Sequence, residues 1–438
     1  MSAAPESVGG PWWRGVPRYA WVVLAISALG WLFDTMDQQL FNLVRQPSLK
    51  ELLGPEAPKE LVTRWSGILT SVFLIGWAVG GFVFGALGDR LGRARTMAIT
   101  VLIYAGFTGL NGFVDDPVSY AVCRFFTALG VGGEFAAGAA LVAEVFPQRS
   151  RPLALGFLQA LSAVGNSIAA VITLLLSSVP VGGWRIAFFI GAAPAVLVFF
   201  IRRVVREPEA WSGAREQASS EGLAIGSIAG LFRDPVLQRN TVAGTLLAIA
   251  GVGGLWGVGF WLPDLIGNTF SHLPAKELGR FRSMIAITQQ AGAFLGMLGY
   301  AAVSERVGRR KALLGAFLLA FVAVQLTFRN LHDVPTAYGY AFLLGICALS
   351  PFAAYAIYFP ELFPTRLRAT GVGFCYNCAR LVAAAAPLLL GQLAARYASP
   401  IDPSTGLRTA ASIVACVYIV GLIGLSFAPE TRGKPLPE

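Results

Sequence analysis

The sequence predicts an all-α integral membrane protein with twelve transmembrane helices in two pseudo-symmetric six-helix bundles. Of its 438 residues 55% are hydrophobic and only 13% are charged, whereas a soluble domain carries about 25% charged residues. Apolar runs of about 18 residues or more recur along the chain, each long enough to cross a bilayer. They are continuous and lack the alternation of a transmembrane β-barrel. An internal duplication divides these runs into two sets of six.

The duplication is visible in three pairs of charged segments. GALGDRLGRAR ends one apolar run and YAAVSERVGRRKA ends another, with Glu305 in the second at the place that Asp89 has in the first. In the same order, AEVFPQRSR is followed by its counterpart PELFPTRLR, where Glu361 answers Glu144. REPEAW is answered more loosely by APETRG. Three repeats in one order and near one spacing indicate that a unit of roughly half the chain was duplicated.

Twelve apolar segments of roughly 20 residues or more can be placed on the sequence. They lie at 19–44, 66–88, 96–114, 118–146, 152–177 and 184–203, and then at 241–267, 282–303, 311–330, 335–360, 369–394 and 409–428. The first six predict an N-terminal bundle at 19–203 and the second six a C-terminal bundle at 241–428. Residues 204–240 are richer in Arg, Glu, Ser and Gly, and we expect them to link the bundles.

The distribution of basic residues predicts the orientation in the membrane. Lys and Arg concentrate in the short turns at Arg90–Arg95, Arg149–Arg151 and Arg306–Lys311, and such turns face the cytoplasm under the positive-inside rule. The linker and the terminal segments 1–18 and 429–438 are then also cytoplasmic. The first twenty residues lack the apolar core of a cleavable signal peptide. We expect a multi-pass protein of the plasma membrane, in a bacterium the inner membrane.

No catalytic, metal or cofactor site is expected from the sequence, and therefore no enzyme activity. The histidines His272 and His332 fall in predicted outer loops, and the five cysteines lie within apolar runs, where cysteine packs as a small hydrophobe. The glycine-rich stretch Gly251–Gly254 lacks the Lys and Ser/Thr of a nucleotide-binding loop. The net charge of +10 belongs to membrane topology, so nucleic acid is not expected as a partner.

Two motifs resemble those of the major facilitator superfamily. GxxxDRxGR after the second apolar segment is similar to the signature loop of that family, and its degenerate copy follows the eighth segment. RFFTALGVGGEF resembles the family's fourth-helix motif. Membership implies two six-helix halves that rock around a midplane site. GVGGEFAAGAALVAEVFPQRSR and the DxxD of the first segment are similar to sialate, lactate and other carboxylate:proton symporters. PELFPTRLRATG and PETRGK also occur in sugar porters and organic-ion transporters, so these two segments do not distinguish between the subfamilies.

The charged turns are expected to gate the transporter, a role that the resemblance implies. A carboxylate such as Asp89 interacts favourably with the N-terminus of a neighbouring helix, by about 0.3 to 1 kcal/mol when exposed, and such a contact latches the halves in one state. The alternative, simple positive-inside anchoring, explains Arg90 but not the carboxylate present in both copies. We expect the Asp89 latch to dominate and the Glu305 copy to be weaker. The predicted gating residues are Gly85, Asp89, Arg90, Gly92, Arg93, Glu144, Arg151, Glu305, Arg309, Glu361 and Arg368.

Four ionisable residues within the predicted spans are candidates for proton coupling. A charge at the bilayer centre costs roughly 2.5 to 3.5 kcal/mol, so such residues usually serve a function. Asp34 and Asp37 share one helical face, where two carboxylates resist joint ionisation. Similar depths predict that Asp37 pairs with Arg124, either as a proton-dependent contact or as a permanent structural ion pair. Glu134 is either a second proton site or a buried hydrogen bonder.

Arg380 is the candidate anchor for an anionic substrate. It lies near the midplane, with Asn377 and Tyr376 on the same helical face, and its planar guanidinium matches a carboxylate in bidentate geometry. The alternative is a standing pair with Glu134 or Asp34. Other polar and aromatic residues are expected to line a cavity for a small polar solute: Gln38, Gln39, Gln159, Asn166, Trp256, Trp261, Gln289, Gln290, Tyr355 and Tyr358. The substrate contacts predicted among these are Gln38, Gln159, Trp256, Gln289 and Tyr355.

The sequence therefore predicts a secondary active transporter that moves a small organic anion by proton symport through alternating access. The anion would be a carboxylate such as a monocarboxylate, a sialate or an aromatic acid. A sugar or polyol carrier is the main alternative, with Arg380 structurally paired. A drug efflux antiporter is disfavoured because LALGFLQALSAVGNSIAAVI lacks the Gly-Pro element of such antiporters. A transporter-like membrane sensor is also disfavoured. The expected partners are the solute, protons and the lipid bilayer, and the expected state is a monomer.

Overall fold

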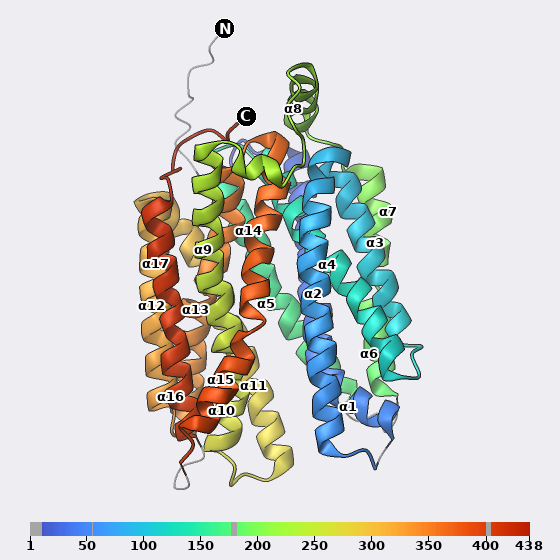
Figure 1. Ribbon diagram of the computed structural model, residues 1–438, viewed down its shortest axis with the longest axis vertical. Helices are drawn as coiled ribbons and strands as arrows, with labels where there is room; N and C mark the ends of the chain where they lie inside the picture. The colour runs from blue at the N-terminus through green and yellow to red at the C-terminus, as the bar shows by residue number, and fades with distance from the viewer. Residues whose placement is uncertain (1–10, 55, 177–181, 400–403) are drawn as a thin grey trace.

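The helices of this protein stand side by side along the long axis of the molecule, as the computed structural model shows (Figure 1). The structure describes residues 11–54, 56–176, 182–399 and 404–438, so part of the predicted terminal segment 1–18 lies outside the described residues. Helices α1 to α7 form one half of the molecule and helices α9 to α17 the other (Figure 1). The linker helix α8 projects from one end, which we call the α8 end.

The first half contains the segments predicted for the N-terminal bundle. Its helices are α1 (Arg18–Leu53), α2 (Lys59–Leu91), α3 (Arg93–Asn111), α4 (Pro117–Val145), α5 (Arg151–Leu176), α6 (Gly183–Gly191) and α7 (Ala195–Val204). The predicted span 184–203 is thus two helices in line. Pro194 is the residue immediately before the second, and proline lacks the N–H that would continue the first. The linker carries α8 (Glu209–Ser220) and the 3₁₀ turn η1 (Ala229–Phe232).

The second half repeats this arrangement with more interruptions. It contains α9 (Pro235–Gly257), η2 (Gly259–Trp261), α10 (Leu262–Thr269), α11 (Ala275–Val307), α12 (Arg309–Asn330), α13 (Val334–Leu362), η3 (Thr365–Leu367), α14 (Arg368–Ala383), α15 (Ala386–Arg396), α16 (Thr405–Val414), η4 (Ala415–Val417) and α17 (Tyr418–Phe427). Within the described residues nine helices are long and apolar enough to cross a membrane. The remaining predicted spans correspond to α3, α11 and the pair α14–α15.

Both halves use the same close helix contact. A Cβ atom on Gly80 of α2 would lie 2.0 Å from the carbonyl oxygen of Leu129 in α4. A Cβ atom on Gly296 of α11 would lie 2.2 Å from the carbonyl oxygen of Ile346 in α13. Only glycine lets the two backbones approach so closely. The two contacts stand at corresponding places of the repeat, so the duplicated sequence builds a duplicated packing arrangement.

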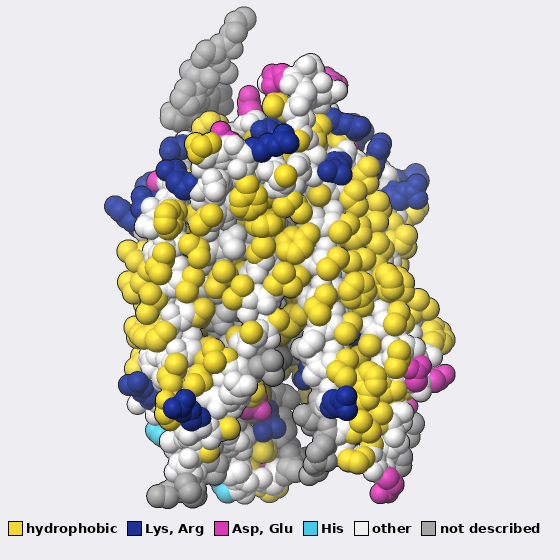
Figure 2. All heavy atoms as spheres, in the orientation of Figure 1, with side chains coloured by type: hydrophobic (Ala, Val, Ile, Leu, Met, Phe, Trp, Pro, Cys, Tyr) yellow, Lys and Arg dark blue, Asp and Glu magenta, His cyan; other side chains and the backbone are white. Residues whose placement is uncertain are grey.

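The halves meet along two pseudo-equivalent pairs of helices. Helix α14 packs against α2, and α5 packs against α11. On the face that Figure 2 shows, apolar side chains form a broad band across the middle, and charged side chains gather toward the two ends. This distribution suits a protein surrounded by lipid. The surface is hollowed between the halves at the end opposite α8 (Figure 2).

Candidate functional site: a central cavity and the contacts that close it

A cavity of about 70 Å³ lies between the two halves. Its lining comes from α1, α2 and α5 on one side and from α9, α11, α13 and α14 on the other. The lining residues are Trp31, Thr35, Gln38, Trp77, Gln159, Ser162, Asn166, Val252, Leu255, Trp256, Met297, Leu349, Phe352, Tyr376 and Arg380. Five of them are aromatic. Such a chamber presents ring faces and a few polar groups, the composition typical of a small-molecule site.

Among the described residues that form this lining, Arg380 is the only charged one. Its guanidinium carbon lies 4.0 Å from the ring centre of Trp77 and 3.9 Å from that of Tyr376, and its Nη1 donates to Asn377 Oδ1 at 2.7 Å. No carboxylate of the described residues forms an ion pair with it, although Asp34 is near enough to act on it through space. The rings therefore enclose the guanidinium of a residue that is 3% exposed and that has no counter-ion among the described residues.

The cavity wall also contains hydrogen-bonding atoms without partners. Within the described part of the chain, the indole nitrogens of Trp31 and Trp77 and the Oε1 atom of Gln159 are buried and unpaired. Buried polar atoms usually have partners. Two N–H donors beside a lone guanidinium are the groups that a carboxylate would satisfy.

Asp34 and Glu134 form a second polar group, between α1 and α4. Both side chains are 1% exposed, and they are close enough for one to hydrogen-bond the other when a proton is shared. No described residue donates a hydrogen bond to either oxygen of Asp34. Gly30 makes room for the pair, since a Cβ atom there would lie 2.2 Å from Glu134 Oε1. The hydrogen-bonding neighbour of Asp34 is thus Glu134.

The predicted contact between Asp37 and Arg124 is present. Arg124 Nη2 lies 3.1 Å from Asp37 Oδ2, with both side chains fully buried, and Thr108 Oγ1 donates to Asp37 Oδ1 at 2.7 Å. The guanidinium carbon of Arg124 also lies 4.3 Å and 4.6 Å from the rings of Phe41 and Phe73. Both charges are therefore neutralised and enclosed. The roles predicted for these residues in proton coupling stay predictions.

The other predicted substrate contacts divide into two groups. Gln38, Gln159, Trp256 and Tyr376 line the cavity, and Asn377 contacts Arg380. Tyr355 and Gln289 are not among the lining residues: the Tyr355 hydroxyl donates to the backbone oxygen of Leu247 at 2.7 Å, and Gln289 is buried in α11.

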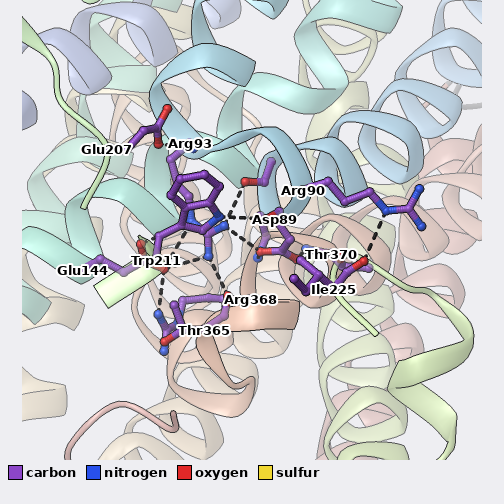
Figure 3. Close-up of polar contacts among 12 residues, drawn as sticks. Asp89, Arg90, Arg93, Glu144, Glu207, Trp211, Ile225, Thr365, Arg368 and Thr370 are labelled. Atoms are coloured by element: carbon purple, nitrogen blue, oxygen red, sulfur yellow. Dashed lines mark hydrogen bonds and ion pairs between the residues drawn. The ribbon is translucent and has the colours of Figure 1, made fainter. Parts of the chain in front are cut away.

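At the α8 end, Asp89 caps the N-terminus of a helix in the other half. It accepts hydrogen bonds from the backbone N–H groups of Ala369 and Thr370 at 3.1 Å and 2.8 Å, and from the Thr370 hydroxyl at 2.5 Å (Figure 3). Arg93 holds the same carboxylate from its own half at 3.0 Å. A carboxylate at a helix N-terminus satisfies free N–H groups and complements the helix dipole.

Glu144 makes a second bridge between the halves. It lies 2.9 Å from Arg93 in its own half and 2.7 Å from Arg368 in the other (Figure 3). Arg93 also donates to the backbone oxygen of Thr365 across the interface at 2.6 Å. The side chains of Arg93, Glu144 and Arg368 are at most 1% exposed, so these contacts close the α8 end.

The linker reinforces this closure through two side chains outside the predicted gating set, Glu207 and Trp211. Glu207 accepts from the backbone N–H groups that begin α3, including Arg93 at 2.7 Å. Gly92 permits this contact with φ of 112°, since a Cβ atom there would lie 2.4 Å from the Glu207 carboxylate. Trp211 donates to the backbone oxygen of Asp89 at 2.7 Å, and Arg90 donates to that of Ile225 at 3.2 Å (Figure 3).

The second copy repeats the contacts within its half. Arg309 lies 2.7 Å from Glu305 and 3.0 Å from Glu361. Glu430 accepts from the backbone N–H groups of Arg309 and Arg310 at 2.9 Å and 3.2 Å, as Glu207 does in the first copy. Burial opposes the charge on Glu430, but these backbone donors, with those of Arg432 and Thr431, hold the pKa of its carboxyl below the ordinary value.

The two copies differ in the contacts that cross between the halves. Asp89 is fully buried, whereas Glu305 is 32% exposed. Two substitutions explain the difference. Where α14 begins Arg368-Ala369-Thr370, α5 begins Arg151-Pro152-Leu153. Pro152 has no N–H and Leu153 has no hydroxyl, so the helix that would face Glu305 has lost two of the donors that Asp89 uses.

Three residues outside the predicted set contact the gating residues: Glu207, Thr370 and Glu430. The sequence offered a signal for Glu207 and Glu430, which lie in a pair of repeated charged segments. These loosely repeated segments are REPEAW, which contains Glu207, and APETRG, which contains Glu430. Thr370 carries no such signal, because its role depends on α14 meeting α2.

Comparisons with known proteins agree with this architecture. The model of the family described as "Major Facilitator Superfamily" matches residues 28–298 and 275–438. The "Probable 4-methylmuconolactone transporter" of Cupriavidus pinatubonensis is 32% identical over 409 residues, covering 92% of this chain and 89% of that protein. The "Cis,cis-muconate transport protein" of Acinetobacter baylyi is 30% identical, covering 96% of this chain and 97% of that protein.

A solved structure of the proton:xylose symporter XylE of E. coli has the same fold. Its TM-score is 0.76 at 16% identity, and the match covers 95% of this chain and 98% of that one. The predicted fold class, twelve membrane helices in two six-helix bundles, is thereby confirmed. The protein is a multi-pass membrane transporter that takes a small-molecule substrate. This chain belongs to the major facilitator superfamily.

Proposed function

We propose that this transporter carries a small organic anion, a carboxylate, together with protons. The observation that carries the proposal is Arg380, a buried guanidinium in the central cavity that has no carboxylate partner among the described residues. A permanently charged group in such a place needs a counter-ion. The unpaired indole N–H groups of Trp31 and Trp77 supply the further donors that a carboxylate binds.

The lining favours a planar, unsaturated carboxylate over a polyhydroxylated one. Trp31, Trp77, Trp256, Phe352 and Tyr376 offer ring faces, and flat ligands stack on such faces. The muconate and methylmuconolactone that the two relatives carry, by their names, are acids or lactones of this kind. A sugar would require more hydrogen-bonding side chains than Gln38, Gln159 and Asn166 provide.

Proton coupling is assigned to Asp34 and Glu134. Two carboxyl groups that face each other away from water do not both ionise readily, so the pair holds a proton when the cavity is empty. Asp34 also acts through space on Arg380. An anion on Arg380 therefore disfavours charge on Asp34, which ties proton uptake to substrate binding. Asp37 and Arg124 neutralise each other beside this pair.

We further propose the orientation of the protein in the membrane and its oligomeric state. The basic turns at the α8 end support a cytoplasmic location for that end, with residues 1–18, 204–240 and 429–438 on the cytoplasmic side and the bundles at 19–203 and 241–428. The contacts of Asp89 and Glu144 then close the cytoplasmic side of the cavity. We assign the protein to the inner membrane of a bacterium, as a monomer.

Arg380 is tested by uptake into proteoliposomes with labelled benzoate, cis,cis-muconate and glucose. We expect saturable, pH-gradient-driven uptake of a carboxylate by the wild type. Arg380→Ala should abolish this uptake, and Arg380→Lys should raise KM, since lysine keeps the charge but loses the fork. Arg329→Ala, at an exposed helix end, is the control. Uptake of glucose alone, or full carboxylate uptake by Arg380→Ala, would reject the assignment.

A further inference from the structure

One ion pair of the pseudo-symmetric set is absent at the α8 end. In the first copy, Arg368 crosses from the second half to Glu144 at 2.7 Å. The symmetric contact would join Arg151, the counterpart of Arg368 in the repeat, to Glu361, the counterpart of Glu144. Glu361 instead pairs with Arg309 at 3.0 Å and accepts from the Thr431 hydroxyl at 2.5 Å. No ion pair between Arg151 and Glu361 occurs in the described residues.

A cavity of about 280 Å³ lies where this ion pair would be. Its lining residues come from both halves: Gln148, Arg149, Arg151, Glu305, Arg309, Glu361, Gly433 and Lys434. None of these side chains is apolar, so the walls suit a soluble solute and give a lipid tail no surface. The volume exceeds that of the central cavity.

The charge in this cavity is unbalanced. Four cationic side chains face two carboxylates, and both carboxylates are bound to Arg309. Neither Arg151 nor Lys434 of this lining forms an ion pair with any described residue. Within the described residues, the one hydrogen bond that the Arg151 guanidinium donates is long, Nη2 to the backbone oxygen of Phe146 at 3.4 Å, and its buried Nε has no partner. A buried donor without a partner is costly and rare.

We propose that this cavity binds a phosphate-type dianion, inorganic phosphate or a phosphomonoester, from the side of the α8 end. Guanidinium and ammonium groups bind phosphate oxygens strongly, and a dianion offers charge and oxygens to both Arg151 and Lys434. Arg151 lies at the start of α5 in one half, and Lys434 lies in the C-terminal segment of the other. The anion joins the two and takes the place of the missing ion pair.

Such a site links transport to the anion content of the compartment at the α8 end. The anion holds the two halves together in the state that is closed at this end, and it leaves when they separate. Because a ligand shifts an equilibrium only by its preference for one state, phosphate slows opening without entering the central cavity. The site is separate from Arg380, and its ligand is not the transported solute.

The test is phosphate binding to the purified full-length protein, followed by thermal unfolding and titration calorimetry at constant ionic strength with chloride as the reference anion. We expect a saturable rise of the unfolding midpoint with phosphate and none with chloride. Losing one charge-assisted hydrogen bond weakens binding by about tenfold or more, so Lys434→Gln and Arg151→Gln should each raise the Kd by that factor. Arg306→Gln, on the exposed end of α11 outside the cavity, is the matched control.

Phosphate binding that is weakened about tenfold or more in Lys434→Gln and Arg151→Gln and is unchanged in Arg306→Gln supports the site. The absence of any phosphate effect on the wild type, or an equal effect on all variants, overturns it. Because binding is measured without substrate, this result is independent of whether the protein carries a carboxylate.

Discussion

At the scale of the residue, the two arginines of the membrane interior differ in their neighbours. Arg124 has Asp37 at 3.1 Å, whereas Arg380 has ring faces and an amide but no ion pair within the described residues. Both sit in nearly complete burial. A paired arginine contributes to structure, and an unpaired one is available to a ligand. This difference is the reason why substitutions of the nearby carboxylates should have unlike consequences.

Asp34→Asn and Asp37→Asn should separate coupling from stability. Within the described residues Asp34 has no cationic partner, so Asp34→Asn should leave the unfolding midpoint nearly unchanged and remove the dependence of uptake on an imposed pH gradient. Asp37→Asn leaves Arg124 buried without its counter-ion, which should lower the free energy of unfolding by about 3 to 5 kcal/mol. Uptake with and without a pH gradient, together with thermal unfolding, measures both effects. Intact pH coupling in Asp34→Asn would remove Asp34 as a proton carrier.

Glu430 gives a pH-dependent prediction outside the membrane segments. The folded-state pKa of its carboxyl is lowered, so its contribution is complete above the ordinary pKa of about 4.3 and is lost as the pH falls through the lowered value. Glu430→Gln should reduce stability by about 1 kcal/mol near neutral pH, the scale of a charge at a helix N-terminus.

The measurement for Glu430 is the difference in unfolding midpoint between wild type and variant from pH 7 down to pH 3.5. We expect a constant difference down to about pH 5 and convergence of the two proteins at the acid end. Glu216→Gln, at an exposed position of α8, is the control and should show no difference. A difference that grows as the pH falls would contradict the capping role.

At the scale of the element, the start of α14 and the start of α5 decide which latch forms. The sequence alone predicted that the Asp89 copy would be stronger, from its complete motif. The structural cause lies elsewhere, in Ala369 and Thr370 opposite Asp89 and in Pro152 and Leu153 at the equivalent place. Which helix start faces which carboxylate depends on how the halves pack, and no local pattern records it.

Exchanging these residues should change the balance of the two latches. Thr370→Val removes a hydroxyl from Asp89, and the loss of a hydrogen bond to a charged group costs about 1.5 to 3 kcal/mol. This variant should open more readily at the α8 end. Pro152→Ala with Leu153→Thr restores an N–H and a hydroxyl near Glu305, and it should open less readily.

Opening is followed by labelling of Ser162→Cys, a cavity residue, with an impermeant maleimide applied from the α8 side in a cysteine-free background. Faster labelling in Thr370→Val and slower labelling in the double variant are expected. Equal labelling rates in all three proteins would show that these helix starts do not set the equilibrium.

At the scale of the whole molecule, periodicity and duplication were sufficient to predict the twelve-helix fold. The long apolar runs predict the transmembrane helices directly, and the repeated charged turns predict that the two halves are equivalent. Contacts between distant segments were harder to predict from the sequence. The similar depths of Arg124 and Asp37 in their spans predicted that these two residues pair. The neighbour of Asp34 could not be predicted in this way, because Glu134 reaches it through the space left by Gly30. Tyr355 was expected in the cavity wall, although its hydroxyl is used by the backbone of α9.

The closed arrangement of the halves depends on glycines where α14 crosses α2. A Cβ atom on Gly373 would lie 2.5 Å from the carbonyl oxygen of Gly81, so Gly373→Leu cannot be accommodated while the α8 end is closed. Overpacking typically costs about 1 to 3 kcal/mol, which shifts a two-state equilibrium by about 5- to 150-fold. The variant should therefore remain open at the α8 end, label faster at Ser162→Cys and lose uptake by a similar factor. Gly315→Leu is the control, because a Cβ atom on Gly315 meets nothing within 4 Å. Should Gly373→Leu label and transport like the control, the contact between α2 and α14 would not be the one that closes the transporter.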